Sequence, residues 1–443
     1  MSQSMMSQKQ MSLAKVAQKE PEHRYTNLYS LMHWDYWIRS AATAVLARPG
    51  SSTAGIDGTT RDNFKKNYER EIQMLVETLK KKTYQPQPVR RVYIPKANGK
   101  QRPLGIPVLR DRIVQEALRA ILDPIYEADF QPYSFGFRKG RCTMDAIAVI
   151  MSLTGPTSKY YYVIEGDIKG YFDRVHHRKL LSILKQRIAD KDILNLIWKF
   201  LKAGVMEDGL FARTETGVPQ GGVISPVLAN LCMHYAFDEW MRREHPNNPW
   251  ARYADDGVIH CRTQKEAESL LIELGERFKE CKLELNSEKT RIVYCKDDDR
   301  KGNYLLTTFD FLGYTFRARR SKNRWGKCFI NFSPAVSNAA SKAMRQTIRG
   351  WRMQLKTDVG IEDLSRMFNP VIRGWINYYG CFYKSQLYAV LRHMNRALMN
   401  WARRKYKKLA RHKRRASSWL GRLAGNRPEL FAHWQMGILP TVG

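Results

Sequence analysis

Two adjacent aspartates in the segment Tyr253-Ala254-Asp255-Asp256-Gly257 are the residues of this sequence best suited to chemistry. Strand-prone residues flank the segment on both sides, and Asp-Gly suits a tight hairpin turn. Two carboxylates held this close repel each other unless a cation lies between them. For this pentapeptide alone, an ordinary Asp-Gly turn is as good an interpretation as a cation site.

A third carboxylate follows a different predicted strand. The apolar run 160–164 leads into Glu165-Gly166-Asp167, which places Asp167 at the end of that strand. A carboxylate there, facing an aspartate pair on a neighbouring hairpin, makes a site for two hard divalent ions such as Mg²⁺, which prefer oxygen ligands. Two ions about 4 Å apart can activate an attacking 3′-hydroxyl and stabilise a leaving pyrophosphate. The alternative role for Asp167 is a helix cap, and we assign Asp173 to that role or to structural hydrogen bonding.

A glycine-rich segment, 217–226 (GVPQGGVISP), is the third candidate. A glycine-rich turn that leads into a helix lets the backbone approach a nucleotide closely. Pro226 suits the first turn of the helix that we expect to begin near Ser225. By itself this segment is a weak signal, and a plain loop is the better interpretation.

The elements that must position these residues alternate along the chain. Strand patterns cover 89–94, 102–107, 161–167, 250–260, 290–295 and 309–316; helical patterns cover 25–46, 61–82, 111–126, 177–203, 226–243 and 264–281. Asn98-Gly99 predicts a hairpin between the first two strands. This alternation indicates an α/β or α+β core to about residue 330, and after Pro334 the pattern is nearly all helical.

The charge points to a polyanionic partner. The 443 residues include 75 Lys and Arg against 42 Asp and Glu, a net charge of +33. Residues 341–443 hold 21 of the basic and 4 of the acidic residues. Basic side chains bind nucleic acid because each neutralised phosphate releases condensed counterions. A basic but inert solvated surface is the alternative.

The sequence argues against several other classes of protein. No run of about 18 uncharged apolar residues predicts a membrane span. Seven scattered cysteines without a C-x-x-C pair predict neither zinc nor disulfides, which is typical of a cytoplasmic, bacterial-type protein. The first acidic residue is Glu20, which leaves an organellar transit peptide open.

Taken together, these elements resemble the reverse transcriptases, and more narrowly the proteins encoded by group II introns. The matching segments run in family order: IPKANGKQRPLGIPVLRDRIVQ (94–115), YSFGFRKGR (133–141), EGDIKGYFD (165–173), TGVPQGGVISPVLAN (216–230), RYADDGVIH (252–260), LELNSEKTRIV (283–293), FDFLGYTF (309–316), NPVIRGWINYY (369–379) and RKYKKLARHKRRASSWL (404–420). Many such proteins continue into an H-N-H endonuclease with paired zinc cysteines. We expect that module to be absent, since no C-x-x-C occurs.

The resemblance assigns roles to matched residues. Asp167, Asp255 and Asp256 would be catalytic and, with Ile168, would hold two Mg²⁺ ions, for which Mn²⁺ can substitute. The residues expected to bind the incoming dNTP are Lys96, Arg102, Ile168, Phe172, Gln220 and Lys289. Phe172 would lie under the deoxyribose and exclude a 2′-hydroxyl, and Lys289 would stand near the pyrophosphate. Phe311, Leu312 and Gly313 would contact the primer.

Each of these roles has a structural alternative. Lys96 and Arg102 could lie on a solvated hairpin tip, and Phe172 could be a core aromatic. Lys289 could be an ordinary surface lysine. Phe311, Leu312 and Gly313 could belong to an apolar strand of the core.

The implied fold is an α+β right-hand polymerase followed by an all-helical thumb. We expect a flexible arm (1–24), an N-terminal extension with fingers (25–110), a fingers and palm core (111–318), a helical thumb or maturase domain (334–402) and a basic nucleic-acid-binding tail (403–443).

The implied activity is RNA-templated DNA synthesis by a group II intron protein that also assists splicing and mobility. The partners would be intron RNA, a DNA primer or target and dNTPs, with a homodimer left open. A domesticated or CRISPR- or defence-associated reverse transcriptase is an alternative, as is an RNA-binding splicing factor without polymerase activity. The intact aspartate set argues against the last. We expect regions 25–46 and around Trp351, Trp375 and Tyr378 to grip the intron.

Overall fold

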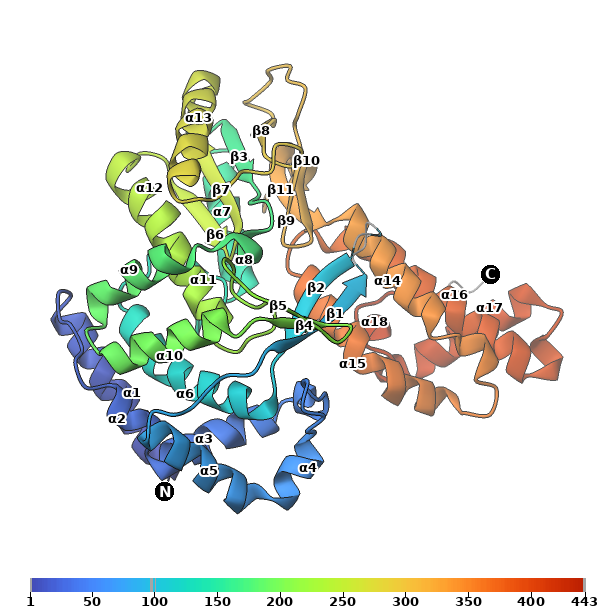
Figure 1. The fold of residues 1–443 in the computed structure, drawn as a ribbon. Helices are drawn as coiled ribbons and strands as arrows, with labels where there is room; N and C mark the ends of the chain where they lie inside the picture. The colour runs from blue at the N-terminus through green and yellow to red at the C-terminus, as the bar shows by residue number, and fades with distance from the viewer. Residues whose placement is uncertain (1, 96–98, 100, 441–443) are drawn as a thin grey trace. The chain divides into compact units, whose positions relative to one another are not determined.

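The chain divides into two compact units in the computed structural model, which describes residues 2–95, 99 and 101–440 (Figure 1). The first unit comprises residues 1–146 and 164–291, and the second comprises 147–163 and 292–443. Each unit has its own buried apolar core. Within the described residues, none of the helices has the length and apolar character needed to cross a membrane.

The N-terminal half of the first unit is a helical layer built around one long buried helix. Its helices are α1 (Ser2–Lys19), α2 (Tyr29–Met32), α3 (Asp35–Leu46), α4 (Arg61–Lys66), α5 (Tyr68–Lys80) and α6 (Leu109–Tyr126). Helices α1 and α3 both lie against α6. The Trp37 indole donates a hydrogen bond to the Ala117 carbonyl (3.2 Å), which fixes α3 against the middle of α6.

Residues 1–24, expected to form a flexible arm, differ from that expectation because they contain α1. Leu13 and Ala17 are buried, and the Gln10 side chain donates to the Ala120 carbonyl of α6 (2.9 Å). The Tyr25 hydroxyl donates to the Leu13 carbonyl (3.0 Å). The apolar residues of this segment are sparse in sequence, but they fall on one face of α1 and bury it against α6.

A small sheet of order β2-β1-β4-β5 lies beside this layer. Its strands are β1 (Val89–Pro95), β2 (Gln101–Ile106), β4 (Val205–Glu207) and β5 (Leu210–Ala212). The predicted hairpin is confirmed, since β1 and β2 pair antiparallel with Pro95 opposite Gln101. Lys96, to which we assigned a triphosphate contact, lies outside the described residues.

A second sheet of the first unit carries the aspartates. It contains β6 (Trp250–Tyr253), β7 (Asp256–Cys261) and β3 (Tyr162–Gly166), in the order β6-β7-β3. The accompanying helices are α8 (Tyr171–Arg174), α9 (His177–Arg187), α10 (Lys191–Lys202), α11 (Ser225–Met233), α12 (Glu239–Glu244) and α13 (Gln264–Glu280), with a π-helical turn at His234–Asp238. Thr263 and Glu266 form a capping box that begins α13 directly after β7.

Asp190 joins the N-terminal segment to the centre of this unit. One carboxylate oxygen accepts from the amides of Asp192 and Ile193 and so caps α10. The other oxygen accepts from the amides of Leu28 (2.8 Å) and Tyr29 (2.7 Å). A single buried carboxylate therefore satisfies four backbone donors from two distant parts of the sequence.

The second unit begins with strands and ends with helices. Its elements are the later part of α7 (Thr143–Thr154), most of β8 (Arg291–Tyr294), the sheet β11-β10-β9 and five helices. The bounds are β9 (Phe309–Phe311), β10 (Tyr314–Lys322), β11 (Cys328–Val336), α14 (Asn338–Gly350), α15 (Ile361–Tyr379), α16 (Tyr388–Lys405), α17 (Lys413–Asn426) and α18 (Ala432–Gln435). The change to helix comes just after Val336, close to the predicted change at Pro334.

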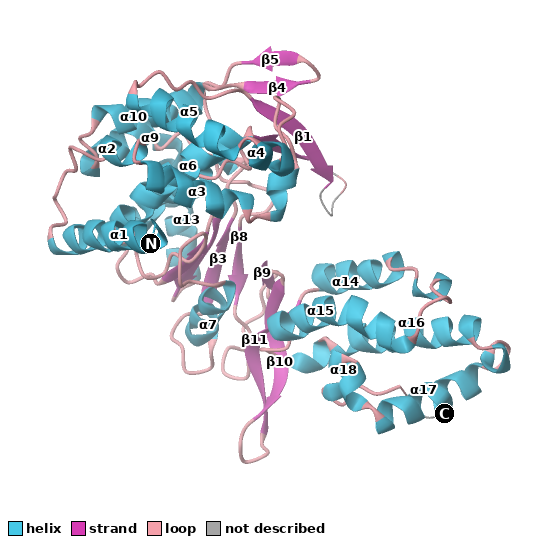
Figure 2. Cartoon of the chain, turned by 90° about the horizontal axis from the view of Figure 1, so that it is seen from below, coloured by secondary structure: helices cyan, strands magenta, loops and turns pink. Residues whose placement is uncertain are grey.

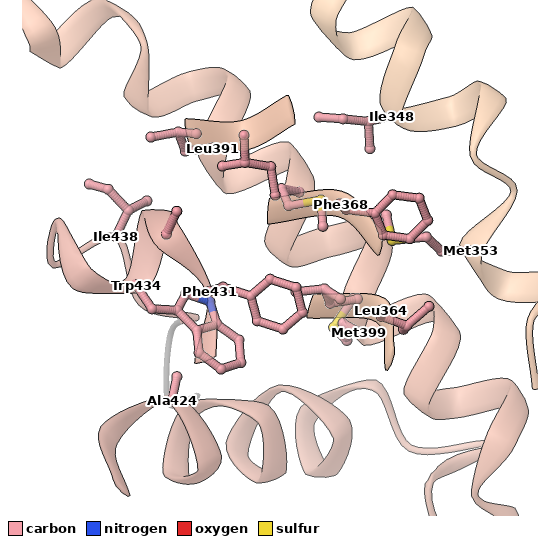
Figure 3. Close-up of a cluster of buried hydrophobic side chains, with 14 of the residues drawn as sticks. Ile348, Met353, Leu364, Phe368, Leu391, Met399, Ala424, Phe431, Trp434 and Ile438 are labelled. Carbon is pink, nitrogen blue, oxygen red and sulfur yellow. The ribbon is translucent and has the colours of Figure 1, made fainter. Parts of the chain in front are cut away.

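The helices of the second unit share one core (Figure 3). Phe431 and Trp434 lie between residues of α15, α16 and α17, with ring centroids 4.7 Å apart. Asn395 of α16 satisfies the polar groups inside this core, because its carbonyl oxygen accepts from the Trp434 indole (2.8 Å) and its amide donates to the Ile438 carbonyl (2.9 Å). The chain after α17 is thereby tied back into the helical core.

Three aromatic residues of the second region expected to bind intron RNA have partners within this unit. Trp351 stacks on Phe368 (4.4 Å between ring centroids) and on Trp375 (5.7 Å). The Tyr378 hydroxyl donates to the Leu312 carbonyl (2.8 Å). Their ring faces are therefore in use within the second unit.

Candidate active site

The Asp255-Asp256 pair lies on the turn between β6 and β7. Trp250 pairs with Ile259 and Tyr253 with Asp256, which leaves Ala254 and Asp255 as the two turn residues. Ala254 has a φ of 58°. A small side chain suits this left-handed conformation better than a β-branched or bulky one. The predicted hairpin is present, but its turn lies at Ala254-Asp255, because Asp256 and Gly257 already pair with Tyr253 and Arg252 within the sheet.

A buried arginine holds this turn in place. Arg252 is fully buried, and its guanidinium donates to both carboxylate oxygens of Asp238 (2.7 and 2.6 Å). It also donates to the Ala254 carbonyl (2.6 Å), the Ser134 hydroxyl (2.7 Å) and the Asn230 carbonyl oxygen (3.2 Å). Removing one partner of such a pair typically costs about 3–5 kcal/mol, because the remaining charge is left buried and unpaired. Arg252 therefore fixes the turn that carries the aspartates through its hydrogen bond to the Ala254 carbonyl.

The segment 133–141 passes directly beside this turn. Its backbone pairs with β6, since the Phe135 amide donates to the Arg252 carbonyl (2.8 Å) and the Arg252 amide donates to the Tyr133 carbonyl (2.9 Å). A Cβ atom added to Gly136 would lie 2.3 Å from the Ala254 nitrogen. Only glycine allows this approach, and the Asn230 amide donates to the Gly136 carbonyl (2.6 Å) to hold it.

Asp167 lies just after β3 and is held by the segment 284–290. The Asn286 side-chain amide (2.8 Å) and the Lys289 ammonium (3.0 Å) both donate to Oδ2 of Asp167. The Asn286 backbone amide donates to the Asp167 carbonyl (2.8 Å). The helix-cap alternative is wrong for the adjacent helix, because the N-cap of α8 is Gly170 and no side chain caps it.

The three carboxylates act on one another electrostatically. Removal from water, and then the charge of Asp167, raise the pKa of Asp255 above its usual value, against the opposing charges of Arg102 and Arg252. Removal from water, followed by the charges of Asp255 and Asp167, raises the pKa of Asp256 to about 7. Part of Asp256 is exposed, but the surrounding atoms still displace much of the water around its carboxylate. If all three carboxylates were ionised, three negative charges would therefore lie close together.

This donor set has the chemistry of a site for hard divalent cations. All three side chains offer oxygen, and a cation would relieve the repulsion that raises the two pKa values. The described part of the chain contains no cluster of three or more His, Cys, Asp or Glu already arranged around a metal position. In this arrangement the ammonium of Lys289 is the positive charge beside Asp167. A cation bound by Asp167 would displace or share that contact.

The glycine-rich segment lies between α8 and β2. The Val218 amide donates to the Phe172 carbonyl (2.7 Å), and the Gly105 amide donates to the Gln220 carbonyl (2.6 Å). A Cβ atom on Gly221 would lie 2.5 Å from the Gly105 oxygen, and Gly221 has a φ of +109°. The predicted helix does begin at Ser225. The glycines therefore serve close backbone packing as well as the turn.

A groove opens between this segment and the small sheet. It is lined by Arg91, Tyr93, Gly105, Asp173, Glu207, Arg213 and Gln220, among others. Gln220 thus lies in a groove wide enough to admit a polar ligand. Phe172 is half-buried next to this segment, with its ring centroid 5.6 Å from that of Tyr171. Its core-aromatic alternative stays open.

Of the predicted site residues that the structure describes, eight belong to the first unit and three to the second. Asp167, Asp255, Asp256, Arg102 and Lys289 interact electrostatically within the first unit. Ile168, which directly follows Asp167, is buried and forms an isolated antiparallel β-bridge with Leu285. Phe311, Leu312 and Gly313 belong to the second unit. Phe311 ends β9, and Leu312 and Gly313 form the turn to β10 with φ values of 49° and 80°. Phe311 is buried there, as its core alternative expects.

Sequence reasoning missed the residues that support the aspartates. Arg252 and Asp238 are 14 residues apart, and no local pattern pairs them. Asn286 and Gly136 lie inside segments that matched the family, but their contacts to Asp167 and Ala254 cross 119 and more than 100 residues of chain. An arginine three residues before the Asp-Asp pair is the one available signal, because a basic residue in an apolar strand needs a buried partner.

Comparison with known proteins identifies two family matches. Residues 94–316 match the family described as reverse transcriptase (RNA-dependent DNA polymerase), and residues 341–419 match the group II intron maturase-specific domain. The chain is 35% identical over 389 residues to protein YkfC of Escherichia coli (strain K12), covering 80% of this chain and 98% of that protein. It is 31% identical over 453 residues to the group II intron-encoded protein LtrA of Lactococcus lactis subsp. cremoris, covering 83% and 72%.

A solved structure of telomerase from Candida albicans with a fragment of telomeric RNA aligns with a TM-score of 0.43 and 12% identity. That alignment covers 86% of this chain and 68% of the telomerase chain. A likeness at this level does not by itself establish a shared fold.

We expect Mg²⁺ to raise the melting temperature more at pH 8 than at pH 5.5. Because the pKa of Asp256 is raised to about 7, the folded chain keeps a proton that the unfolded chain releases, so stability falls as pH rises toward 7. A bound cation offsets that loss when the carboxylates are ionised. The measurement is a thermal melt in EDTA or Mg²⁺ at both pH values.

The matched variants are Asp256→Asn in the site and Glu77→Gln, an exposed carboxylate on α5. The first should lose most of the pH-dependent Mg²⁺ shift, and the second should keep it. An equal shift in all three proteins would mean that the cation acts elsewhere.

Proposed function

Because the chain belongs to the reverse transcriptases encoded by group II introns, we propose that it is an RNA-directed DNA polymerase that also binds its intron RNA and assists splicing and mobility. The observation that supports this activity best is the aspartate turn, fixed from below by Arg252, beside the carboxylate of Asp167. A rigid group of crowded carboxylates is costly to maintain, and nucleotidyl transfer gives it a use.

The carboxylates would hold two Mg²⁺ ions, with Asp167, Asp255 and Asp256 as side-chain ligands and Ile168 beside them. When bound, such ions favour ionisation of a primer 3′-hydroxyl and neutralise charge on the triphosphate. On binding a cation, Asp167 would release the Lys289 ammonium. Lys289 would then lie free to stabilise the pyrophosphate and to donate a proton to it.

The nucleotide would lie between β2 and the glycine-rich segment. Arg102, exposed on β2, exerts its charge on Asp255, which supports a role for its guanidinium in binding triphosphate oxygens. Gln220 would support the nucleotide or the template base. Phe172 would lie under the deoxyribose, where a 2′-hydroxyl would clash with its ring.

The rest of the chain would handle the nucleic acids. We propose fingers and palm for 25–318, a thumb or maturase domain for 334–402 and a basic tail from 403. A groove in the second unit supports this assignment, since its lining includes Arg349, His393, Arg396, Arg403 and Arg404 and none of its lining residues is acidic. Such a surface suits a phosphate backbone of intron RNA or of a DNA primer or target. Phe311, Leu312 and Gly313 would contact the primer end.

Asp255→Asn should abolish primer extension while the affinity for RNA stays within about twofold of wild type. The substitution keeps the size of the side chain but removes a charge that serves cations rather than template. The measurement is cDNA synthesis on an annealed primer–template together with RNA binding. Asp62→Asn, on the surface helix α4, is the matched control and should extend normally. Near-normal synthesis by Asp255→Asn would rule out the assignment.

Phe172→Ala should admit ribonucleotides, because the ring is proposed to occupy the space of a 2′-hydroxyl. The ratio of dNTP to rNTP incorporation efficiency should fall by roughly tenfold or more. Tyr171→Phe, which keeps the neighbouring ring, is the control for general disturbance of α8. If discrimination in Phe172→Ala holds within about threefold of wild type, Phe172 is a core residue and the gate lies elsewhere.

A further inference from the structure

Strands β10 and β11 form a hairpin (Figure 2), and its closing turn carries Trp325. Trp325, in its closing turn, is 75% exposed, although tryptophan is highly buried on average. From Tyr314 to Val336 the chain has six basic residues and no Asp or Glu; the basic residues are Arg317, Arg319, Arg320, Lys322, Arg324 and Lys327. This contrasts with Trp351 and Trp375, whose rings pack inside the second unit.

The closing turn is held in one conformation by its own hydrogen bonds. The Asn323 side-chain oxygen accepts from the amides of Trp325 (3.0 Å) and Lys327 (2.9 Å). The Asn323 amide donates to the Lys327 carbonyl (2.9 Å), and Gly326 adopts a φ of +84° that favours glycine. The backbone that carries Trp325 is therefore organised before any ligand arrives, which lowers the entropy lost on binding.

One face of the indole is already covered and the rest is open. The guanidinium carbon of Arg324 lies 4.1 Å from the centroid of the Trp325 ring. A cation on one face leaves the opposite face for a second planar group, and a nucleobase stacks well there. Solvent exposure of an indole gains nothing for folding, so packing does not explain the residue.

The tip lies far along the hairpin from the proposed primer contact. Strand β10 has nine residues between the Gly313 turn and Lys322, a span of roughly 30 Å. Asp298 forms a hydrogen bond with β11, accepting from the Ile330 amide (2.7 Å). Ile330 lies three residues after Lys327, outside the tip. Residues 322–327 themselves include three basic and no acidic side chains.

We propose that the hairpin tip, residues 322–327, binds single-stranded RNA by stacking an unpaired base on Trp325. Lys322, Arg324 and Lys327 contact the flanking phosphates. A base inside a duplex cannot reach the indole, whereas an unpaired loop or bulge of a folded RNA can. The proposal rests on the proposed function, because it names the surface that holds unpaired RNA in a protein that binds an intron.

The test is the affinity of the full chain for a fluorescein-labelled, unstructured single-stranded RNA, in EDTA and without dNTPs. Trp325→Ala should weaken binding by about 5- to 100-fold, the range found when a base loses an aromatic partner, with an unchanged salt slope. Trp325→Tyr should bind within about threefold of wild type. Arg324→Gln should reduce the slope of log K against log salt by roughly 0.7.

Leu305→Ala is the matched control, since Leu305 is 98% exposed in the same unit and is not part of the hairpin. It should bind as wild type. An RNA duplex of equal length should lose little affinity on Trp325→Ala. Wild-type binding by Trp325→Ala would overturn the proposal, as would equal losses on single strand and duplex or an effect confined to single-stranded DNA. Because the assay needs no polymerisation, failure of the wild-type chain to extend a primer would overturn the proposed function and leave this result standing.

Discussion

The ion pair between Arg252 and Asp238 is the interaction on which the site depends. Both side chains are fully buried, so each charge has lost its water and must be satisfied by protein. The guanidinium achieves this with five donated hydrogen bonds, one of which ends on the Ala254 carbonyl in the aspartate turn. The turn cannot relax away from the sheet without leaving a buried charge short of a partner.

This rigidity makes the crowding of carboxylates tolerable. Burial raises the pKa of both Asp255 and Asp256, and the negative charge of Asp167 adds to the rise at each of them. The positive charge of Arg102 offsets part of the rise in the pKa of Asp255, and that of Lys289 offsets part of the rise at Asp256. The carboxylates therefore repel one another in a way that cations can relieve, and they lie at the end of β3, in the β6–β7 turn and at the start of β7.

The sequence predicts this site in part because local rules suffice for some of it. A hairpin around Asp-Asp-Gly, a carboxylate after an apolar strand and a helix that begins at Ser225 each follow from a few neighbouring residues, although the hairpin turn falls at Ala254-Asp255. The pairing of Arg252 with Asp238 and the approach of Gly136 to Ala254 depend on which strands meet, which no short window contains. The same limit applies to α1, whose few apolar residues acquire meaning only against α6.

The aromatic residues are a second example of what a short stretch of sequence does not determine. Composition places Trp351, Trp375 and Trp325 in one class, rich in basic neighbours, and only the fold separates the packed rings from the exposed one. Burial is a property of the assembled unit, so a pattern of residue types cannot decide which aromatic faces remain open to a ligand.

The central claim is that the turn held by Arg252 presents Asp255 and Asp256 with Asp167 as one cation site. The most direct measurement is X-ray diffraction at the manganese absorption edge, from crystals grown with Mn²⁺ and a non-hydrolysable dNTP analogue. We expect anomalous density from Mn²⁺ within coordination distance of carboxylate oxygens of both Asp167 and Asp255, with the Lys289 ammonium moved off Asp167. Ordered Mn²⁺ elsewhere in the first unit, with the Asp167–Lys289 contact intact, would contradict it.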